Sequence, residues 1–261
     1  MSYETLIFDV SANVATVVLN RPEKRNAINR KMFEELADVF ERIAGDRDIR
    51  SFVLRGSGDH FCSGADLSGI EDSPRTPVDM LARMRDIHQL MRDIVYCPKP
   101  GLAAVRGYAA GGGANLALAC DLVVMTEDAK FAELFVKRGL VVDMSGTFTL
   151  PRAVGLHRAK ELALLGDTID AQRAYEMGIA NRVVNSDELD TVVKELADRL
   201  ASGPPITMAF IKKAMNDSFN LSFDEVLDQE SFNQSVLFST KDLQEAITAF
   251  FEKREPRFTG E

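Results

Sequence analysis

Hydrophobic positions recur along this chain with two different periods, and each period predicts one class of element. Residues 4–10 and 14–19 are rich in β-branched and aromatic side chains and flank a short polar turn, which predicts a β-hairpin. Apolar side chains then repeat every three or four residues, which predicts an amphipathic helix over residues 30–44. The same spacing predicts a second helix over residues 79–96.

Short, continuous apolar runs predict buried strands, and the C-terminal part of the chain shows only helical spacing. The predicted strands are 51–54, 102–105 and 122–125. The predicted C-terminal helices are 187–201, 205–219, 223–237 and 240–253. Strands that alternate with helices and precede a helical tail indicate an α/β fold, with a core over 1–184 and a helical region over 185–261.

Composition excludes several classes of function. With a formal net charge of −9 over 261 residues and no basic stripe, the chain is not expected to bind nucleic acid. No apolar run approaches the roughly 20 residues of a membrane-spanning helix, and the N-terminus does not resemble a signal peptide. The three cysteines stand in unrelated contexts, which predicts a reducing, cytoplasmic setting. The three histidines lack metal-ligand spacing, so no metal site is expected.

Two turns rich in small residues follow predicted strands. The stretch GYAAGGGANLALACD (107–121) places three glycines between a strand and a helix, where backbone N–H groups can face an anion or a developing oxyanion. The glycines can equally serve close packing of strand and helix. The stretch HFCSGADLSG (60–69) is a second turn of this kind, with Asp66 as a possible cap of a short helix. Together, the two turns could hold a single carbonyl oxygen.

Asp143 stands in the otherwise apolar stretch GLVVDMSGTF (139–148). One interpretation is structural: the side chain caps the first N–H groups of a following helix. The other is chemical. Among Val141, Val142 and Met144, burial disfavours the charged carboxylate and raises its pKa, which suits a group that accepts and returns a proton.

Several motifs, in order along the chain, resemble the enoyl-CoA hydratase/isomerase (crotonase) superfamily. They are NRPEKRNAI (20–28), HFCSGADL (60–67), KPGLAAVRGYAAGGGANLALACDL (99–122), GLVVDMSGT (139–147), PRAVGLHRAKELALLGDTIDAQRAYEMGIANRVV (151–184) and FFEKREPRFTG (250–260). The resemblance implies a crotonase-like spiral of stacked ββα turns with a C-terminal helical trimerisation region. It also implies an acyl-CoA thioester substrate, no further cofactor, and self-association as a trimer or a dimer of trimers.

The resemblance also implies a set of site residues. The N–H groups of Ala65 and Gly112 occupy the positions that hold the thioester oxygen, and each preorganised donor is worth roughly 3 kcal/mol to a developing oxyanion. The other implied acyl-CoA contacts are Lys24, Arg25, Ala27, Ser63, Gly64, Asp66, Leu67, Ser68, Gly111, Asn115 and Phe135. Lys24 and Arg25 supply positive charge for CoA phosphates, or are an ordinary solvated basic pair.

The chain departs from the hydratase pattern at both acidic positions. The positions that carry the two hydratase glutamates hold Asn115 and Phe135 here, and neither side chain can exchange a proton at neutral pH. Glu133 is the nearby carboxylate that could substitute, although its position suggests a surface acid. Asp143, by contrast, coincides with the aspartate of dienoyl-CoA isomerases and of the ring-opening isomerases of phenylacetate catabolism.

These departures favour an acyl-CoA isomerase with Asp143 as its proton-transfer group. An enoyl-CoA hydratase of fatty-acid β-oxidation, with Glu133 or an Asn115-held water in the missing roles, is the main alternative. Thioester hydrolysis and a non-catalytic acyl-CoA-binding role also stay open. The polar segment 68–78, which contains two prolines, predicts a mobile loop that shapes the acyl pocket together with helix 79–96. Met80, Met84 and Met91 are predicted to belong to the core rather than the pocket wall.

Overall fold

The computed structural model describes residues 3–68 and 76–261. Most of the loop predicted over 68–78 therefore lies outside the described residues. The strands are β1 (Leu6–Ser11), β2 (Val14–Leu19), β3 (Ser51–Gly56), β4 (Gly101–Val105), β5 (Tyr108–Ala110), β6 (Leu122–Thr126), β7 (Lys130–Ala132), β8 (Thr168–Asp170) and β9 (Arg182–Val184). The helices are α1 (Arg30–Gly45), α2 (Pro77–Val95), α3 (Gly112–Leu118), α4 (Gly146–Val154), α5 (Leu156–Leu165), α6 (Ala171–Met177), α7 (Leu189–Ala201), α8 (Pro205–Asp217), α9 (Phe223–Leu237) and α10 (Lys241–Glu252). Two short 3-10 helices are η1 (Pro22–Lys24) and η3 (Leu134–Arg138).

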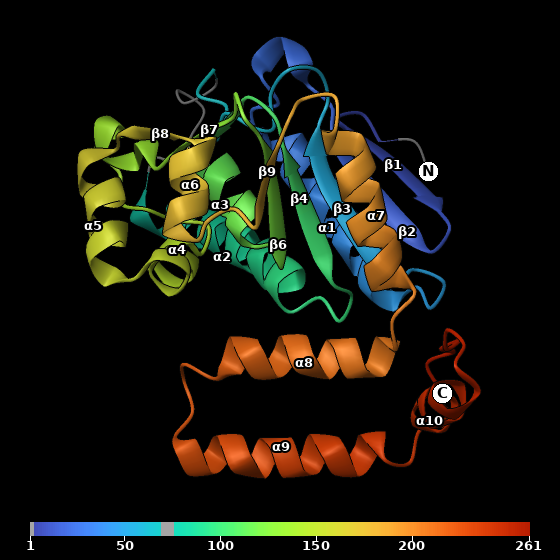
Figure 1. Cartoon of the computed structure of the whole chain (residues 1–261). Helices are drawn as coiled ribbons and strands as arrows, with labels where there is room; N and C mark the ends of the chain where they lie inside the picture. Colours follow the sequence, from blue (N-terminus) through green and yellow to red (C-terminus); the bar gives the residue numbers. More distant parts are fainter. Residues whose placement is uncertain (1–2, 69–75) are drawn as a thin grey trace.

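Six strands form the main sheet in the order β1-β2-β3-β4-β6-β9 (Figure 1). The predicted hairpin is confirmed, because β1 and β2 pair antiparallel with Leu6 opposite Leu19. The remaining neighbours pair in parallel. Parallel neighbours need crossover connections, and the helices predicted over 30–44 and 79–96 supply them as α1 and α2.

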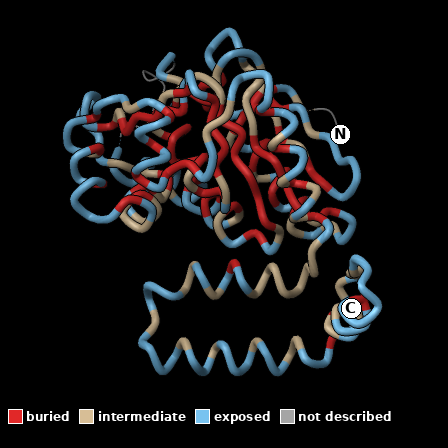
Figure 2. Tube along the Cα trace, in the orientation of Figure 1, coloured by how far each residue is buried: buried red, intermediate tan, exposed pale blue. Residues whose placement is uncertain are grey.

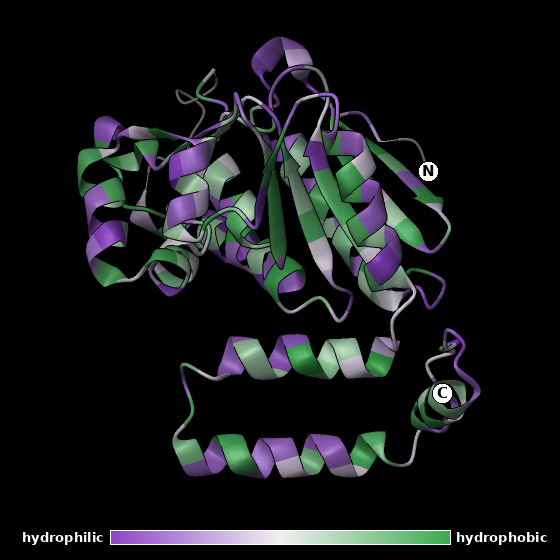
Figure 3. Ribbon diagram, viewed as in Figure 1, coloured by the Kyte–Doolittle hydropathy of each residue, from purple (hydrophilic) through white to green (hydrophobic). Residues whose placement is uncertain are grey.

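The central strands of the main sheet are buried on both faces, as parallel strands covered by helices require (Figure 2). On the face covered by α1 and α2, Phe40 meets Phe52 edge to face, with ring centroids 5.1 Å apart. Side chains alternate along a strand, so Val53 points to the other face and packs against α7. Hydrophobic residues predominate along the neighbouring central strands of the main sheet (Figure 3).

A second, smaller sheet has the order β5-β7-β8 and lies beside α3. Each of its strands has only three residues. The hydrophobic pattern did not predict these strands, because three residues are too few to show an alternation. This sheet matters for function because β5 leads into the triple-glycine turn and β7 leads into Glu133.

The C-terminal helices α8 and α9 lie beneath the core and run antiparallel to each other (Figure 1). Lys212 of α8 is buried and anchors this pair to the core. Its ammonium donates to the Asp121 carboxylate at 2.9 Å and to the Ile94 carbonyl at 3.3 Å. Asp242, in the first turn of α10, holds the segment that follows this helix. Its carboxylate accepts hydrogen bonds from the backbone N–H groups of Thr259 and Gly260.

The predicted boundary at 184/185 coincides with the end of β9, the last strand among the described residues. However, α7 lies beyond that boundary and still packs on the main sheet through Leu189 and Val193. The chain leaves the core only at α8. Of the three methionines predicted in the core, Met91 is buried and Met84 packs against the core. The prediction is wrong for Met80, which is exposed on the first turns of α2.

Candidate active site

The structure places the two small-residue turns side by side. Cys62 N–H donates to the Tyr108 carbonyl, and Ala110 N–H donates to the Cys62 carbonyl, each at 2.9 Å. Gly64 then passes so close to the triple-glycine turn that a Cβ on it would lie 2.8 Å from the Ala110 oxygen and 3.4 Å from the Gly112 nitrogen. Its φ of +97° also favours glycine. Glycine is required at this position because a side chain would collide with the backbone of the triple-glycine turn.

Ala65 and Gly112 each present a backbone N–H group near this meeting point. Within residues 3–68 and 76–261, neither N–H donates to a protein oxygen. Ala65 is exposed, whereas Gly112 is buried at the first position of α3, where an N–H has no partner within the helix. Two unpaired donors on adjacent turns can hold one oxygen atom that carries negative charge.

Asp66 fastens the first turn; the short helix that it was predicted to cap would lie mostly outside the described residues. Its carboxylate accepts from Ser68 N–H at 2.9 Å, from Ser68 Oγ at 2.6 Å and from the Arg21 guanidinium at 2.7 Å. The hydrogen bonds from Ser68, and then the Arg21 contact, lower the pKa of Asp66 to about 2. Leu67 and Ser68 are both exposed. The Asp66 carboxylate is thus engaged within the protein, and the exposed backbone and side chains of the turn are left to bind a ligand.

The basic pair Lys24 and Arg25 lies at the rim of the same turn. Both side chains are exposed, at the end of η1. Their carbonyls hold Ser63, because Ser63 N–H donates to Arg25 O at 3.0 Å and Ser63 Oγ donates to Lys24 O at 3.4 Å. Ala27 is buried behind them. The structure thus places both basic residues beside the first turn.

Asn115 and Phe135 are both buried on the far side of the triple-glycine turn. Asn115, on α3, donates from Nδ2 to the backbone oxygen of Asp143 at 2.9 Å. Phe135, on η3, packs near Gly111, whose N–H donates to the Ala132 carbonyl at 2.8 Å. The two positions that distinguish the chain from the hydratase pattern therefore both lie next to the proposed oxyanion donors.

Glu133 is not the surface acid that its position in the sequence suggested. Its side chain is fully buried, with 0% exposed area. Burial, and then the negative charge of Asp143, raise its pKa to about 8, although the nearby Asn115 amide opposes this shift. No local pattern in the sequence indicates this burial, because Glu133 directly follows β7, which pairs with segments distant in the sequence, β5 and β8.

Asp143 does not cap α4, so the structural interpretation of this residue is wrong. The helix begins at Gly146 after Ser145, and no side chain caps its first turn. It is the backbone oxygen of Asp143 that accepts from Gly146 N–H, at 2.9 Å. No hydrogen bond to the Asp143 carboxylate occurs within the described part of the chain. Its side chain is left available for chemistry.

The environment of Asp143 differs from what its sequence neighbours suggested. Val141 is 78% exposed, so it does not supply an apolar wall. Burial nevertheless raises the pKa of Asp143, and the positive charges of His88 and Arg83 on α2 oppose that shift. The sequence did not point to these two residues, because α2 approaches Asp143 only in the folded chain.

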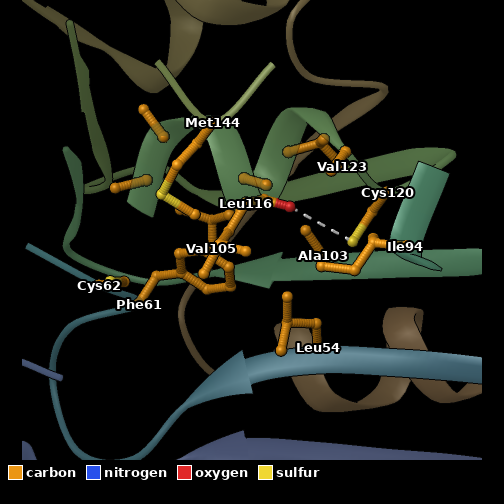
Figure 4. Close-up of a cluster of buried hydrophobic side chains, with 14 of the residues drawn as sticks. Leu54, Phe61, Cys62, Ile94, Ala103, Val105, Leu116, Cys120, Val123 and Met144 are labelled. Carbon is orange, nitrogen blue, oxygen red and sulfur yellow. Dashed lines mark hydrogen bonds between the residues drawn. The ribbon is translucent and has the colours of Figure 1, made fainter. Parts of the chain in front are cut away.

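The loop after Asp143 has an unusual backbone. Met144 and Ser145 adopt left-handed conformations, with φ of 48° and 61°, which non-glycine residues rarely adopt. Met144 is buried in the same apolar cluster as Phe61 and Cys62 (Figure 4). Its sulfur lies where a Cβ on Gly112 would come within 2.7 Å. The Asp143 loop is therefore held directly against the Gly112 turn.

Neither a metal site nor a membrane span is found in the described residues. No group of three or more His, Cys, Asp or Glu side chains in 3–68 and 76–261 could hold a metal ion. Likewise, none of the described helices is both long enough and apolar enough to cross a bilayer. The described cysteines are free and buried.

Comparison with known proteins decides the family. The family model described as enoyl-CoA hydratase/isomerase matches residues 9–261. The chain belongs to the enoyl-CoA hydratase/isomerase family. It is 38% identical to the 1,2-epoxyphenylacetyl-CoA isomerase of Escherichia coli (strain K12), over 98% of this chain and 99% of that protein. It is 32% identical to the crotonyl-CoA hydratase of Syntrophomonas wolfei, over 99% of both proteins.

A solved structure supports the same assignment. The putative enoyl-CoA hydratase of Streptomyces coelicolor A3(2) superposes with a TM-score of 0.95 and 34% identity, over 100% of this chain and 96% of that one. The crotonase-like fold expected from the sequence is thereby confirmed. Members of the enoyl-CoA hydratase/isomerase family similar to this chain are named both as isomerases and as hydratases. Family membership identifies this protein as an acyl-CoA hydratase/isomerase. The choice between isomerisation and hydration has to be argued from the residues of the site.

Proposed function

We propose that this protein is an acyl-CoA isomerase in which Asp143 transfers the proton. The observation that carries the proposal is the Asp143 carboxylate, which is partly buried, has a raised pKa and forms no hydrogen bond within the described residues. It lies on a loop packed against Gly112, one of the two unpaired N–H donors. A base on a loop adjoining an oxyanion site meets the requirements for moving a proton next to a thioester.

The reaction follows from these positions. Asp143 takes a proton from a carbon acidified by the thioester, and the electron pair of the broken C–H bond moves into an enolate. The N–H groups of Ala65 and Gly112 stabilise the negative charge on the enolate oxygen. Asp143 then returns the proton to another carbon of the conjugated system, which moves a double bond or opens a strained ring. No atom is gained or lost, and no cofactor beyond the CoA of the substrate is required.

The CoA part of the substrate is expected to follow the first turn. Lys24 and Arg25 are exposed beside Ser63 and offer positive charge to phosphate groups on a chain with a net charge of −9. The backbone from Gly64 to Ser68 is held rigid by the Asp66 carboxylate. Phosphate binding at the rim would therefore place the thioester over the two N–H donors.

A hydratase is the second candidate, favoured by the names of several relatives and by the buried Glu133. Hydration needs one group to activate water and one to deliver a proton, and Asn115 and Phe135 can do neither. Glu133, with 0% exposed area, is not in contact with solvent. The site thus lacks an exposed second acid among the described residues.

The ratio of isomerisation to hydration tests the proposal. We expect a 3-enoyl-CoA to be converted to the 2-enoyl-CoA at least 100-fold faster than crotonyl-CoA is hydrated, because each missing acid–base group removes roughly 10²–10⁴-fold of the rate. The two reactions are followed by absorbance of the conjugated thioester, with the same enzyme preparation. Hydration at a rate equal to isomerisation would contradict the proposal and favour the hydratase.

We also propose self-association through the C-terminal helices, as a trimer or a dimer of trimers. The apolar side chains exposed on α8 to α10 and their connections are Ile211, Met215, Phe219, Phe223, Leu227, Phe232, Phe238, Ile247, Phe250 and Phe251. So many exposed aromatic residues on one segment are typical of an interface. Sedimentation equilibrium should give a mass of three or six chains of 28.9 kDa. A monomer at micromolar concentration would contradict this expectation.

A further inference from the structure

Within the described residues, four buried oxygen atoms around the Asp143 loop have no hydrogen-bond partner. They are both carboxylate oxygens of Glu133, Oδ1 of Asn115 and the hydroxyl of Ser145. Glu133 and Asn115 both have 0% exposed area, so bulk water does not reach them. A buried polar atom without a partner costs about 1–3 kcal/mol, and a buried, unpaired charge costs considerably more. Some feature of the site has to offset this cost.

The orientation of the Asn115 amide is set by its surroundings. Nδ2 donates to the backbone oxygen of Asp143 at 2.9 Å, so the other end of the amide is the oxygen. An amide oxygen can only accept a hydrogen bond, and so can an ionised carboxylate. An ionised Glu133 would be a fully buried charge whose two oxygens accept no hydrogen bond from the described residues.

We propose that Glu133 is a neutral carboxylic acid in the resting protein and forms, with Asp143, an acid–carboxylate pair that holds a single proton. Protonation of Glu133 removes the unpaired buried charge, which is the largest of these costs. This inference assigns Glu133 a role in tuning Asp143 rather than in contacting substrate. Its effect on catalysis rests on the proposed isomerase function, whereas the protonation itself does not.

The charged groups around the pair support this distribution of the proton. Burial and the negative charge of Asp143 both favour the neutral form of Glu133, whose pKa is raised to about 8. On α2, His88 and Arg83 bear on Asp143 and favour its ionised form. On η3, Lys137 pairs with Asp167 at 3.7 Å. The Arg83 guanidinium therefore favours a carboxylate at Asp143, and the proton is assigned to Glu133.

A neutral Glu133 limits the site to one negative charge. When Asp143 accepts the substrate proton, that charge moves to the enolate oxygen, and the total is unchanged. An ionised Glu133 would add a second negative charge beside the enolate and disfavour its formation. Because the folded-state pKa of Glu133 is raised, the active, neutral form is present at neutral pH and is lost as the pH rises through about 8.

Infrared difference spectroscopy tests the protonation without reference to activity. At pH 7, the wild-type protein should show the C=O band of a buried, protonated carboxyl, which shifts in D₂O and disappears as the pH is raised above about 8. Glu133→Gln should lack this band. Glu127→Gln, the same change at an exposed glutamate, should retain it. Absence of the band from the wild-type protein at pH 7, or its persistence in Glu133→Gln, would overturn the proposal.

The pH dependence of isomerisation tests the effect on Asp143. For the wild-type protein and Glu127→Gln, kcat/KM should fall about tenfold per pH unit above the Glu133 pKa of about 8. Glu133→Gln keeps a neutral side chain of the same shape, so it should retain activity at pH 7 and lose this alkaline decline. An alkaline decline that survives in Glu133→Gln would overturn the tuning role. If no isomerisation is detected at all, the proposed function fails, and the infrared result still decides the protonation.

Discussion

Replacing Asp143 with asparagine should reduce isomerisation by at least 100-fold and leave the fold intact. Asparagine has nearly the same shape but cannot carry a proton, and a positioned acid–base group contributes roughly 10²–10⁴-fold to a rate. The backbone oxygen of Asp143, which holds Asn115 and Gly146, is the same in both proteins. The measurement is solvent deuterium exchange into an acyl-CoA, together with the melting temperature of the same preparation.

The melting temperature distinguishes chemistry from structure in this experiment. No described residue bonds to the Asp143 carboxylate, so its loss removes no hydrogen bond within that part of the chain. It also removes a partly buried charge, so the variant should be as stable as the wild type or more stable. Asp187→Asn, at an exposed aspartate, is the matched control and should change neither quantity. Full exchange with lowered stability would show that Asp143 has a structural role.

The second large effect is expected at Gly112. Two substitutions there distinguish the loss of the N–H donor from the steric effect of an added side chain. Gly112→Ala and Gly112→Pro both introduce a Cβ that would lie 2.7 Å from the sulfur of Met144. The methionine chain is flexible and can move aside in both variants. Only proline removes the N–H group, and proline is tolerated at the first position of a helix.

Gly112→Pro should therefore have a kcat roughly 10²–10³-fold lower than that of Gly112→Ala, which is the effect of removing one oxyanion-site donor. The affinity for acyl-CoA should differ much less between the two, since the rim and the first turn are unchanged. Steady-state kinetics and calorimetric binding of a non-reactive acyl-CoA measure these quantities. Equal kcat values would mean that the Gly112 N–H does not hold the thioester oxygen.

The parts of the fold predicted from sequence are those with many turns of regular spacing. The helix predicted over 30–44 is observed at Arg30–Gly45, and that predicted over 223–237 at Phe223–Leu237. Sixteen or fifteen residues show the helical period clearly. The three-residue strands β5, β7 and β8 were not predicted, since their existence depends on pairing between distant segments.

The same reasoning explains what the sequence revealed about the site. The glycine spacing located both small-residue turns, because a close approach of two backbones excludes a Cβ at Gly64. The environment of the acids was predicted less well. Glu133 was expected at the surface and is fully buried, while Val141 was expected to shield Asp143 and is exposed. Burial of these residues is a property of β7 pairing and of α2 packing, which no local pattern encodes.

The small sheet has a consequence for when the protein acquires its function during folding. Cys62 pairs beside β5, β5 pairs with β7, and β7 pairs with β8, so one ladder joins segments far apart in the sequence. Contacts of such long range form slowly, because each closes a long loop of chain. β5 leads into the turn that carries Gly112, and β7 leads into Glu133. We therefore expect acyl-CoA binding to be acquired late in folding, after the strands of the small sheet have paired.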